Sequence, residues 1–140
     1  MADNHTQDQR SYNMSRIRSN NTAPEKIVRS YLFSKGLRFR KNDKRYPGHP
    51  DIVLPKYNTI VFVHGCFWHR HEGCRYATTP STNAKYWQRK FQMNVSRDKR
   101  DQELLERMGW HVLIIWECQL KKDVRSDNLQ KLYFSIVNAL

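Results

Sequence analysis

At 140 residues, of which 39% are hydrophobic, the chain is long enough to bury a core and fits a single domain. Its formal net charge of +12 favours a polyanionic partner. Nucleic acid is favoured over an anionic membrane, because the basic residues are scattered and not gathered on one amphipathic helix. No apolar stretch approaches the ~20 residues of a membrane span, and residues 1–14 lack the apolar region of a signal peptide. We therefore expect a cytoplasmic protein whose three cysteines stay reduced.

The first predicted element is a helix that follows a polar N-terminal segment. Residues 1–21 lack hydrophobic periodicity, and we expect them to form an arm outside the core. The helix is predicted to begin at Thr22, which can cap its N-terminus, with Pro24 in the first turn and Gly36 as the stop. Glu25 stands three residues after Thr22, as in a capping box, and capping is the alternative to a role for Glu25 in a functional site.

Seven further segments follow in the chain. A short edge strand is predicted at residues 37–41, two adjacent strands as in a hairpin at residues 51–54 and 59–64, and a ligand-rich loop at residues 65–83. A basic helix is predicted at residues 84–108, a buried central strand at residues 110–118 and an amphipathic helix at residues 124–139. The basic helix is expected to bury its apolar residues Trp87, Phe91, Val95, Leu104, Leu105 and Met108. This order predicts one α/β domain over residues 22–140, a mixed central sheet flanked by helices.

A cluster of metal-ligand residues stands in the predicted loop. Cys66, His71 and Cys74 form a C-x4-H-x2-C pattern, and Cys118 follows the later strand. If the two strands that lead to these residues are neighbours, Cys118 arrives beside the loop, and three thiolates with one imidazole complete a closed, structural zinc site. The alternative is that Cys118 is a small buried hydrophobe and that the other ligands are incidental.

A second group of chemistry-bearing residues surrounds the two predicted hairpin strands. Asp51 opens an apolar strand, where a carboxylate is costly unless it meets water, a donor or a metal; a plain turn residue is the alternative. A carboxylate that binds Mg2+ serves phosphodiester cleavage, and the arrangement is similar to that of PD-(D/E)xK nucleases. The second strand carries Val63, which offers only a backbone carbonyl, and His64. His64 and His69 could supply a base, although packing alone also explains His64.

The chain resembles the very short patch repair endonucleases, which nick DNA at T:G mismatches. The matching stretches run in the family's order from about residue 11 to 118: "SYNMSRIRSNNTAPEK", "PGHPDIVL", "VFVHGCFWHRH", "YWQRKFQMNVSRDKRD" and "LERMGWHVLIIWEC". Two departures stand out. Val63 occupies a position where the family is expected to have threonine, and Glu72 with Gly73 separates His71 from Cys74 where one residue is expected. Because glycine absorbs such an insertion without strain, we expect the zinc site to survive.

The resemblance implies a restriction-endonuclease-like fold and a role for each matching residue. Asp51 would bind the catalytic Mg2+ with the Val63 carbonyl, and His69 would be the general base. Supporting roles fall to Glu25, His64 and Asp98. The structural zinc would be held by Cys66, His71, Cys74 and Cys118. The aromatic side chains expected to wedge into the base stack beside the mismatch are Phe67, Trp68 and Trp87; large aromatics in a core are the alternative. Contacts from the other groove would come from Lys90 and Asn94, and residues 1–21 would close over the DNA.

The function implied is a Mg2+-dependent endonuclease that nicks double-stranded DNA 5′ to the T of a T:G mismatch left by deamination of 5-methylcytosine. We expect a monomer in the bacterial cytoplasm, acting at the nucleoid, with downstream repair proteins as further partners. Three alternatives remain open at this point. One is a restriction-type or junction DNA endonuclease without mismatch preference, and another is a zinc-stabilised DNA-binding module without catalysis. The third, a ribonucleoprotein component, is disfavoured only by the nuclease-like residues.

Overall fold

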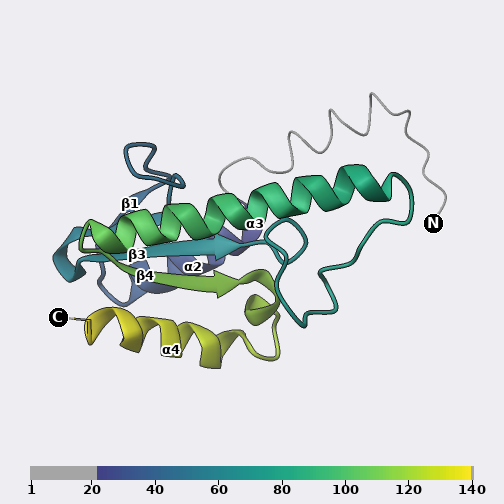
Figure 1. Cartoon of the computed structure of the whole chain (residues 1–140). Helices are drawn as coiled ribbons and strands as arrows, with labels where there is room; N and C mark the ends of the chain where they lie inside the picture. The colour runs from purple at the N-terminus through teal and green to yellow at the C-terminus, as the bar shows by residue number, and fades with distance from the viewer. Residues whose placement is uncertain (1–21, 140) are drawn as a thin grey trace.

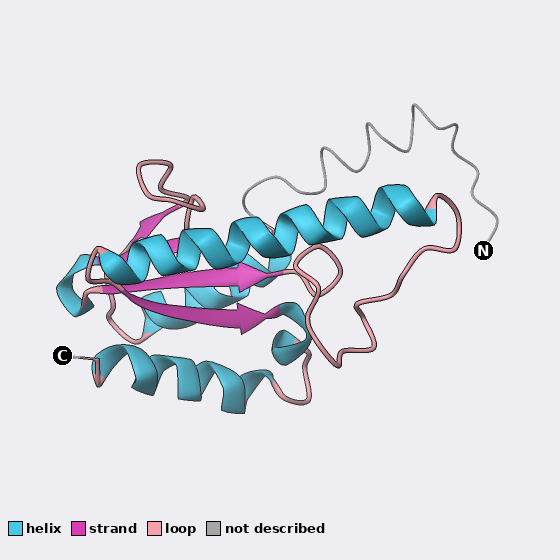
Figure 2. Ribbon diagram, viewed as in Figure 1, coloured by secondary structure: helices cyan, strands magenta, loops and turns pink. Residues whose placement is uncertain are grey.

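The structure is a computed structural model that describes residues 22–139 (Figure 1). The predicted arm at residues 1–21 lies outside the described residues. A four-stranded sheet carries helices on both of its faces, which confirms a single mixed α/β domain over the described part of the chain (Figure 2). Among these residues, no helix combines the length and the apolar character needed to cross a membrane.

The sheet has the strand order β1-β2-β3-β4. Its strands are β1 (Arg40–Lys41), β2 (Ile52–Leu54), β3 (Thr59–His64) and β4 (His111–Trp116). The pairs β1–β2 and β2–β3 are antiparallel, and the short 3-10 turn η1 (Pro55–Tyr57) joins β2 to β3 as the predicted hairpin requires. The pair β3–β4 is parallel, so the carboxyl ends of these two strands lie side by side.

The strand predicted at residues 110–118 is not central. Instead, β4 lies at one edge of the sheet formed by the described residues, and Ile115 is its one buried member. The apolar sequence of β4 results from helices on both faces of the sheet and not from a central position. Leu113 faces the helices on one side of the sheet, and Val112 and Ile114 face the helix on the other. A strand covered on both faces is apolar throughout, whether or not it has two neighbours.

Two layers of apolar side chains flank the sheet. One joins it to α2 (Ala23–Ser34) and α4 (Arg125–Val137), and the other joins it to the long helix α3 (Ala84–Arg107). Successive residues of β3 alternate between the layers, because side chains along a strand point to opposite faces; Val61 enters the first layer, and Ile60 and Phe62 enter the second.

Helix α2 begins where its capping signals predict. The Glu25 N–H donates to Thr22 Oγ1 at 3.4 Å, and Pro24 occupies the first turn. Gly36, with φ +85°, follows the C-terminus and confirms the predicted stop. The Glu25 carboxylate is buried and accepts a hydrogen bond from Arg29 at 3.2 Å. Glu25 is therefore not simply an exposed capping residue.

Helix α3 buries fewer residues than its apolar pattern predicts. Phe91 and Leu105 are buried, whereas Val95, Leu104 and Met108 are exposed by 44%, 36% and 56%. The N-terminal half of α3, which holds Val95, projects past the end of the sheet beside the loop that follows β3 (Figure 1). Leu104 and Met108 belong to the C-terminal end of the helix, which buries Leu105 against the sheet and leaves its other side exposed. Only part of the helix has a sheet to pack against.

Candidate active site and metal cluster

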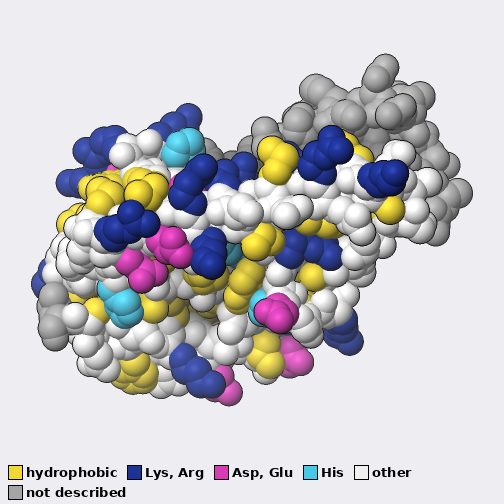
Figure 3. Space-filling view, in the orientation of Figure 1, with side chains coloured by type: hydrophobic (Ala, Val, Ile, Leu, Met, Phe, Trp, Pro, Cys, Tyr) yellow, Lys and Arg dark blue, Asp and Glu magenta, His cyan; other side chains and the backbone are white. Residues whose placement is uncertain are grey.

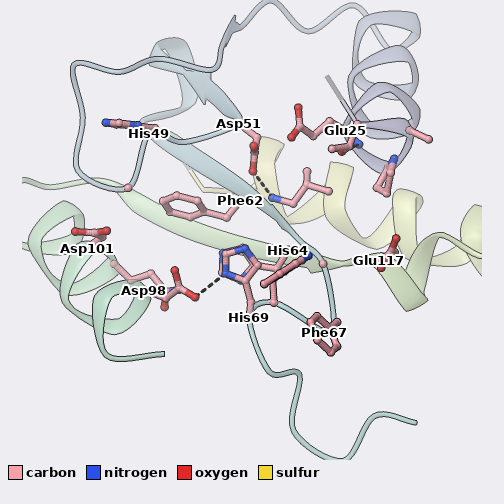
Figure 4. A pocket seen from close by; sticks show the side chains of 18 residues that line it. Glu25, His49, Asp51, Phe62, His64, Phe67, His69, Asp98, Asp101 and Glu117 are labelled. Carbon is pink, nitrogen blue, oxygen red and sulfur yellow. Dashed lines mark hydrogen bonds and ion pairs between the residues drawn. The ribbon is translucent and has the colours of Figure 1, made fainter. Parts of the chain in front are cut away.

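A pocket of about 570 Å³ opens at the carboxyl ends of β3 and β4 (Figure 4). The N-terminus of α2 and the middle of α3 form its walls. The structure brings together here all the residues for which the sequence suggested a part in hydrolysis: Glu25, Asp51, Val63, His64, His69 and Asp98. Two further acidic residues that the sequence analysis missed, Asp101 and Glu117, also line the pocket.

The loop between β1 and β2 closes one side of this pocket. Gly48 has φ +80°, and a Cβ there would lie 3.1 Å from the Phe62 ring and 3.2 Å from Asp101 Cβ. Any side chain at this position would therefore be strained and would push the loop away from α3.

Asp51 is a partly buried carboxyl group held against the end of β3. The Val63 N–H donates to Asp51 Oδ2 at 2.6 Å. Burial, and then the neighbouring Glu25 carboxylate, raises the pKa of Asp51 to about 7, although the Val63 hydrogen bond and Arg29 act in the opposite direction. Two carboxyl groups that disfavour each other's charge in a buried pocket match a divalent cation, because the cation stabilises both anions.

The Val63 carbonyl suits the same cation. Continued by two residues, the β2–β3 register places Pro50 opposite Val63. Proline has no N–H to donate to that carbonyl. Within a strand, the N–H and C=O of one residue point to the same side, so the Val63 carbonyl is directed toward the strand that carries Asp51. The valine side chain takes no part in this arrangement.

His69 and Asp98 form a close pair across the pocket. His69 Nδ1 lies 2.6 Å from Asp98 Oδ2, and since a carboxylate only accepts, the proton of this bond belongs to the imidazole. His69 Nε2 is then left with a lone pair, as a general base requires.

His64 lies beside this pair as a neutral, buried imidazole. Its ring stacks on the His69 ring, with centroids 3.8 Å apart and planes 3° apart. Burial, and then His69, lowers the pKa of His64 to about 3. Among the described residues, His64 Nδ1 is buried without a hydrogen-bond partner.

His64, His69 and Asp98 lie close enough to suggest a metal site, but the ring geometry argues against a shared ion. An imidazole binds a metal near its own ring plane, along the nitrogen lone pair. The two rings are nearly parallel and 3.8 Å apart, so one ion cannot lie in both planes. The stack is better suited to holding His69 in one orientation.

The four predicted zinc ligands meet at the loop next to the pocket. Ligand atoms of Cys66, His71, Cys74 and Cys118 all lie within 4.8 Å of one another. His71 Nδ1 is 3.7 Å from Cys66 Sγ and 3.4 Å from Cys118 Sγ. Tetrahedral zinc with ordinary bond lengths separates sulfur and nitrogen ligands by about 3.6 Å, so the donor set fits this ion.

The backbone of the loop also fits the cluster. Gly73 has φ +72° and open space around its Cα, so it accommodates the extra residue between His71 and Cys74. Burial raises the pKa of the Cys66 thiol to about 12, which means that a thiolate there needs a cation beside it.

Three aromatic residues predicted to contact DNA form one group at the rim of the pocket. The Phe67 ring lies edge-on to Trp68 and Trp87, at 5.0 and 5.7 Å, and to Phe91 at 5.2 Å. Phe67 and Trp68 are only partly buried, and both line the pocket. They are therefore neither core residues nor freely exposed side chains.

Arg70 holds this loop together, a role that the sequence analysis missed. Its guanidinium donates to the carbonyls of Phe67, Ala77 and Thr78 and to the Thr79 hydroxyl, at 2.8 to 3.2 Å. It also lies 3.9 Å from the centre of the Phe91 ring. A single arginine among ligand residues has no pattern that could reveal these contacts.

The two predicted groove contacts on α3 differ in their environment. Lys90 is partly exposed, whereas Asn94 is 5% exposed. Asn94 Nδ2 donates to the Trp68 carbonyl at 3.1 Å, and Asn94 Oδ1 accepts from Arg97 at 3.0 Å. In this structure Asn94 therefore ties the aromatic loop to α3, and a contact of Asn94 with DNA stays a prediction.

Comparison with known proteins identifies the family. The profile of a family described as DNA mismatch endonuclease Vsr matches residues 2–75. DNA mismatch endonuclease Vsr of Escherichia coli K12 is 46% identical over 121 residues, covering 86% of this chain and 77% of its own length. Type II nicking enzyme V.NmeAIP of Neisseria meningitidis is 45% identical over 141 residues and 100% of both chains. Type II nicking enzyme V.XorIIP of Xanthomonas oryzae is 47% identical over 120 residues, covering 86% of this chain and 88% of its own length.

Together with the α/β fold and its pocket of carboxylates and imidazoles, these relatives define a DNA endonuclease. The chain belongs to the DNA mismatch endonuclease family Vsr, which confirms the resemblance read from its sequence.

Proposed function

We propose that this protein is a Mg2+-dependent mismatch endonuclease that hydrolyses one strand of double-stranded DNA 5′ to the T of a T:G pair. One observation carries the proposal: a single pocket unites the partly buried Asp51 carboxyl with the His69–Asp98 pair, and Phe67 and Trp68 line it. A cation ligand, a base and a stacking surface are the three parts that cleavage at a weak base step needs.

Each hydrolytic residue has a stated task. Asp51, the Val63 carbonyl and Glu25 are the groups that would hold Mg2+. Bound there, Mg2+ would stabilise the charge that develops on the phosphate and favour the ionised form of a coordinated water. His69 Nε2 accepts the proton of the attacking water, while Asp98 keeps the ring in the tautomer that leaves Nε2 free. His64 holds the His69 ring from its face.

The aromatic group supports selectivity for a mismatch. Inserting a side chain into the base stack costs a few kcal/mol, and least where the pair is mismatched. Phe67 and Trp68 are rigid side chains close to the hydrolytic residues, so a base step that they open lies near the phosphate to be cut. Trp87 backs Phe67 from α3, and the partly exposed Lys90 follows Trp87 on the same helix.

The Cys/His cluster would make the loop rigid and would take no part in the hydrolysis itself. Four protein ligands leave no open position on zinc for water, so we propose a structural Zn2+ at Cys66, His71, Cys74 and Cys118. The ligands bracket Phe67, Trp68 and His69 in the sequence, so the ion would fix the wedge and the base together.

The wider setting follows from the substrate. A T:G pair has no two-fold symmetry, so we propose that a monomer acts, on mismatches left by deamination of 5-methylcytosine, with downstream repair proteins completing the repair. We also propose that the fold is restriction-endonuclease-like, since a mixed sheet presents Asp51 at the start of one strand beside a second strand that ends in the pocket.

A nicking assay tests the proposal. Labelled duplexes that carry one T:G pair or the matched T:A pair are incubated with wild-type protein, Asp51→Asn and, as a control, Asp123→Asn, whose carboxylate is exposed and outside the pocket. We expect a cut 5′ to the mispaired T with Mg2+ and none with EDTA. Asp51→Asn should lose at least about a hundredfold in rate, since a metal ligand contributes several kcal/mol, and Asp123→Asn should match the wild type.

The alternatives predict other outcomes. Equal cutting of T:G and T:A duplexes would identify a restriction-type or junction nuclease. Tight binding without cutting, for every flanking sequence tried, would identify a DNA-binding module.

A further inference from the structure

Trp116 stands between the Cys/His cluster and the pocket, and it has no assigned role. It is the last residue of β4, and the parallel register places it directly beside His64, the last residue of β3. An indole cannot transfer a proton at neutral pH and is a poor ligand for a hard cation. Any part it plays in hydrolysis must therefore act through its neighbours.

The contacts of Trp116 form one continuous series of side chains. On one side the indole stacks on His71, with ring centroids 4.2 Å apart and planes 7° apart. On the other side it meets the His64 ring at 5.1 Å and 73°. His64 in turn stacks on His69 at 3.8 Å, and His69 bonds Asp98. One aromatic side chain thus touches both a cluster residue and the imidazole that holds the proposed base.

The backbone at Trp116 is fixed as firmly as the ring. Its N–H donates to Gln119 Oε1 at 2.8 Å, at the start of the turn η2 (Glu117–Leu120). The same turn carries Cys118, whose N–H donates to Cys66 Sγ at 3.4 Å. The backbone that carries the indole is therefore tied to the same turn that brings Cys118 to the cluster.

From this series of contacts we propose that Trp116 is a positioning residue that couples the Cys/His cluster to the base His69, by way of His64. The inference rests on the proposed function, because it assumes that His69 is the base. A planar, two-torsion side chain that fills the space between two rings limits how far either can move. Displacing a catalytic group by about 1 Å can cost about a hundredfold in rate, so a loosened His69 should be visible in the chemical step.

The chain offers a matched control on the same strand. Trp110 immediately precedes β4, is likewise partly buried, and lies edge-on to Tyr46 at 5.4 Å. It packs in the layer on the α3 face of the sheet and is not a lining residue of the pocket. Trp110→Leu thus removes an indole and its packing without touching the histidine series.

The experiment compares Trp116→Leu, Trp116→Phe and Trp110→Leu in the full-length, zinc-loaded protein. Metal content is measured first, and the ring signals of His69 are then followed by NMR after 15N-histidine labelling, without DNA. Single-turnover nicking of a T:G duplex gives the rate at saturating enzyme and, separately, the enzyme concentration for half-saturation.

We expect Trp116→Leu to keep its zinc, to broaden or split the His69 ring signals, and to lose about 10- to 100-fold in the saturating rate with unchanged half-saturation. Trp116→Phe should stay within about threefold of the wild type, because a phenyl ring restores both ring contacts. Trp110→Leu should leave the His69 signals and the rate intact, whatever its stability.

Several results would overturn the inference: sharp His69 signals and a normal rate in Trp116→Leu, equal defects in Trp110→Leu, no rescue by phenylalanine, or a defect that excess zinc reverses. The last would make Trp116 a metal-retention residue only. If the wild type does not nick DNA, the proposed function fails, and the NMR comparison still decides whether Trp116 couples the cluster to His69.

Discussion

Asp51, which is partly buried, and His64, which is buried, are titratable groups whose pKa values shift in opposite directions. The pKa of Asp51 rises to about 7 through burial and the Glu25 carboxylate, so over pH 4 to 7 the unfolded chain releases a proton that the folded one keeps. Folding stability from Asp51 is therefore lost as the pH rises through 7. The pKa of His64 falls to about 3 through burial and His69, so its contribution is lost as the pH falls below 6.5.

Mutation separates the two opposite dependences of folding stability on pH. Without Mg2+, Asp51→Asn should gain stability relative to the wild type as the pH rises from 5 to 7, by about 3 kcal/mol, since each pKa unit corresponds to about 1.36 kcal/mol. Urea unfolding at several pH values measures the difference, in which other titrations cancel. His64→Asn should show the opposite trend: its stability relative to the wild type should decrease as the pH rises from 5 to 6.5. A pH-independent difference for Asp51→Asn would contradict the raised pKa.

Asn94 supplies a second prediction on this scale. Its buried amide bonds the Trp68 carbonyl and Arg97, and replacing it by alanine leaves the Trp68 carbonyl without this donor. Asn94→Ala should lower the free energy of unfolding by about 1–3 kcal/mol. Gln92→Ala, at an exposed position of the same helix, should change it by less than about 0.5 kcal/mol. Equal stability of the two variants in urea unfolding would show that the Asn94 bonds contribute nothing net.

The contrast between Asp51 and Asn94 shows which residue-scale features a sequence reveals. A carboxylate opening an apolar strand is anomalous by itself, and the structure places Asp51 in the pocket with His69 as that anomaly suggested. An asparagine on a basic helix is ordinary, and its partner at Trp68 lies 26 residues away. Such contacts depend on tertiary structure, so a lone residue such as Asn94, Arg70 or Trp116 gives no local signal.

At the scale of elements, strands and helices were predictable wherever capping or turn residues stand at the ends of a segment with regular hydrophobic periodicity. Helix α2 has Thr22, Pro24 and Gly36 at its ends, and the apolar runs give β2 and β3. Neighbours were not predictable by the same means. The apolar β4 was predicted to be central, but it is an edge strand of the described sheet. A strand whose two faces are covered by helices has the same hydrophobic sequence as a strand that pairs with neighbours on both sides, so the sequence does not distinguish them.

The loop at residues 65–83 contains neither helix nor strand, and its order depends on Arg70 and the Cys/His cluster. If the cluster holds the proposed Zn2+, replacing Cys66 by serine should prevent its binding and release this loop, because structural zinc contributes much of the local folding energy. Trypsin should then cut after Arg70 or Arg75 at least about tenfold faster, as local opening governs proteolysis. Cleavage in α4, after Lys131, should keep its wild-type rate, since α4 packs elsewhere. Uniform acceleration at all sites would instead indicate global unfolding.

At the scale of the whole molecule, the net charge indicated a polyanionic partner without locating the surface that binds it. Figure 3 shows Lys and Arg side chains along α3 on one face of the protein. Residues 84–97 of this helix carry Lys85, Arg89, Lys90 and Arg97 and no acidic residue, the first being Asp98. A cation in the first turn of a helix opposes the helix dipole, so Lys85 costs some stability at this end of α3. Contact with DNA phosphates would account for a group of cations at this end of α3.

If Lys85 and Arg89 contact phosphates, their loss should weaken all DNA binding and leave discrimination between T:G and T:A unchanged, because phosphate contacts carry no base information. Each contact removed should reduce the slope of log affinity against log salt by about 0.9, through the counterions no longer released. Fluorescence anisotropy with Asp51→Asn as background, to prevent cutting, gives both quantities. Lys131→Ala, an exposed change on α4 across the sheet, is the control and should leave the slope intact. If Lys85→Ala and Arg89→Ala behave like Lys131→Ala, the basic end of α3 is not the DNA surface. If they alter T:G preference instead, these residues contact the bases.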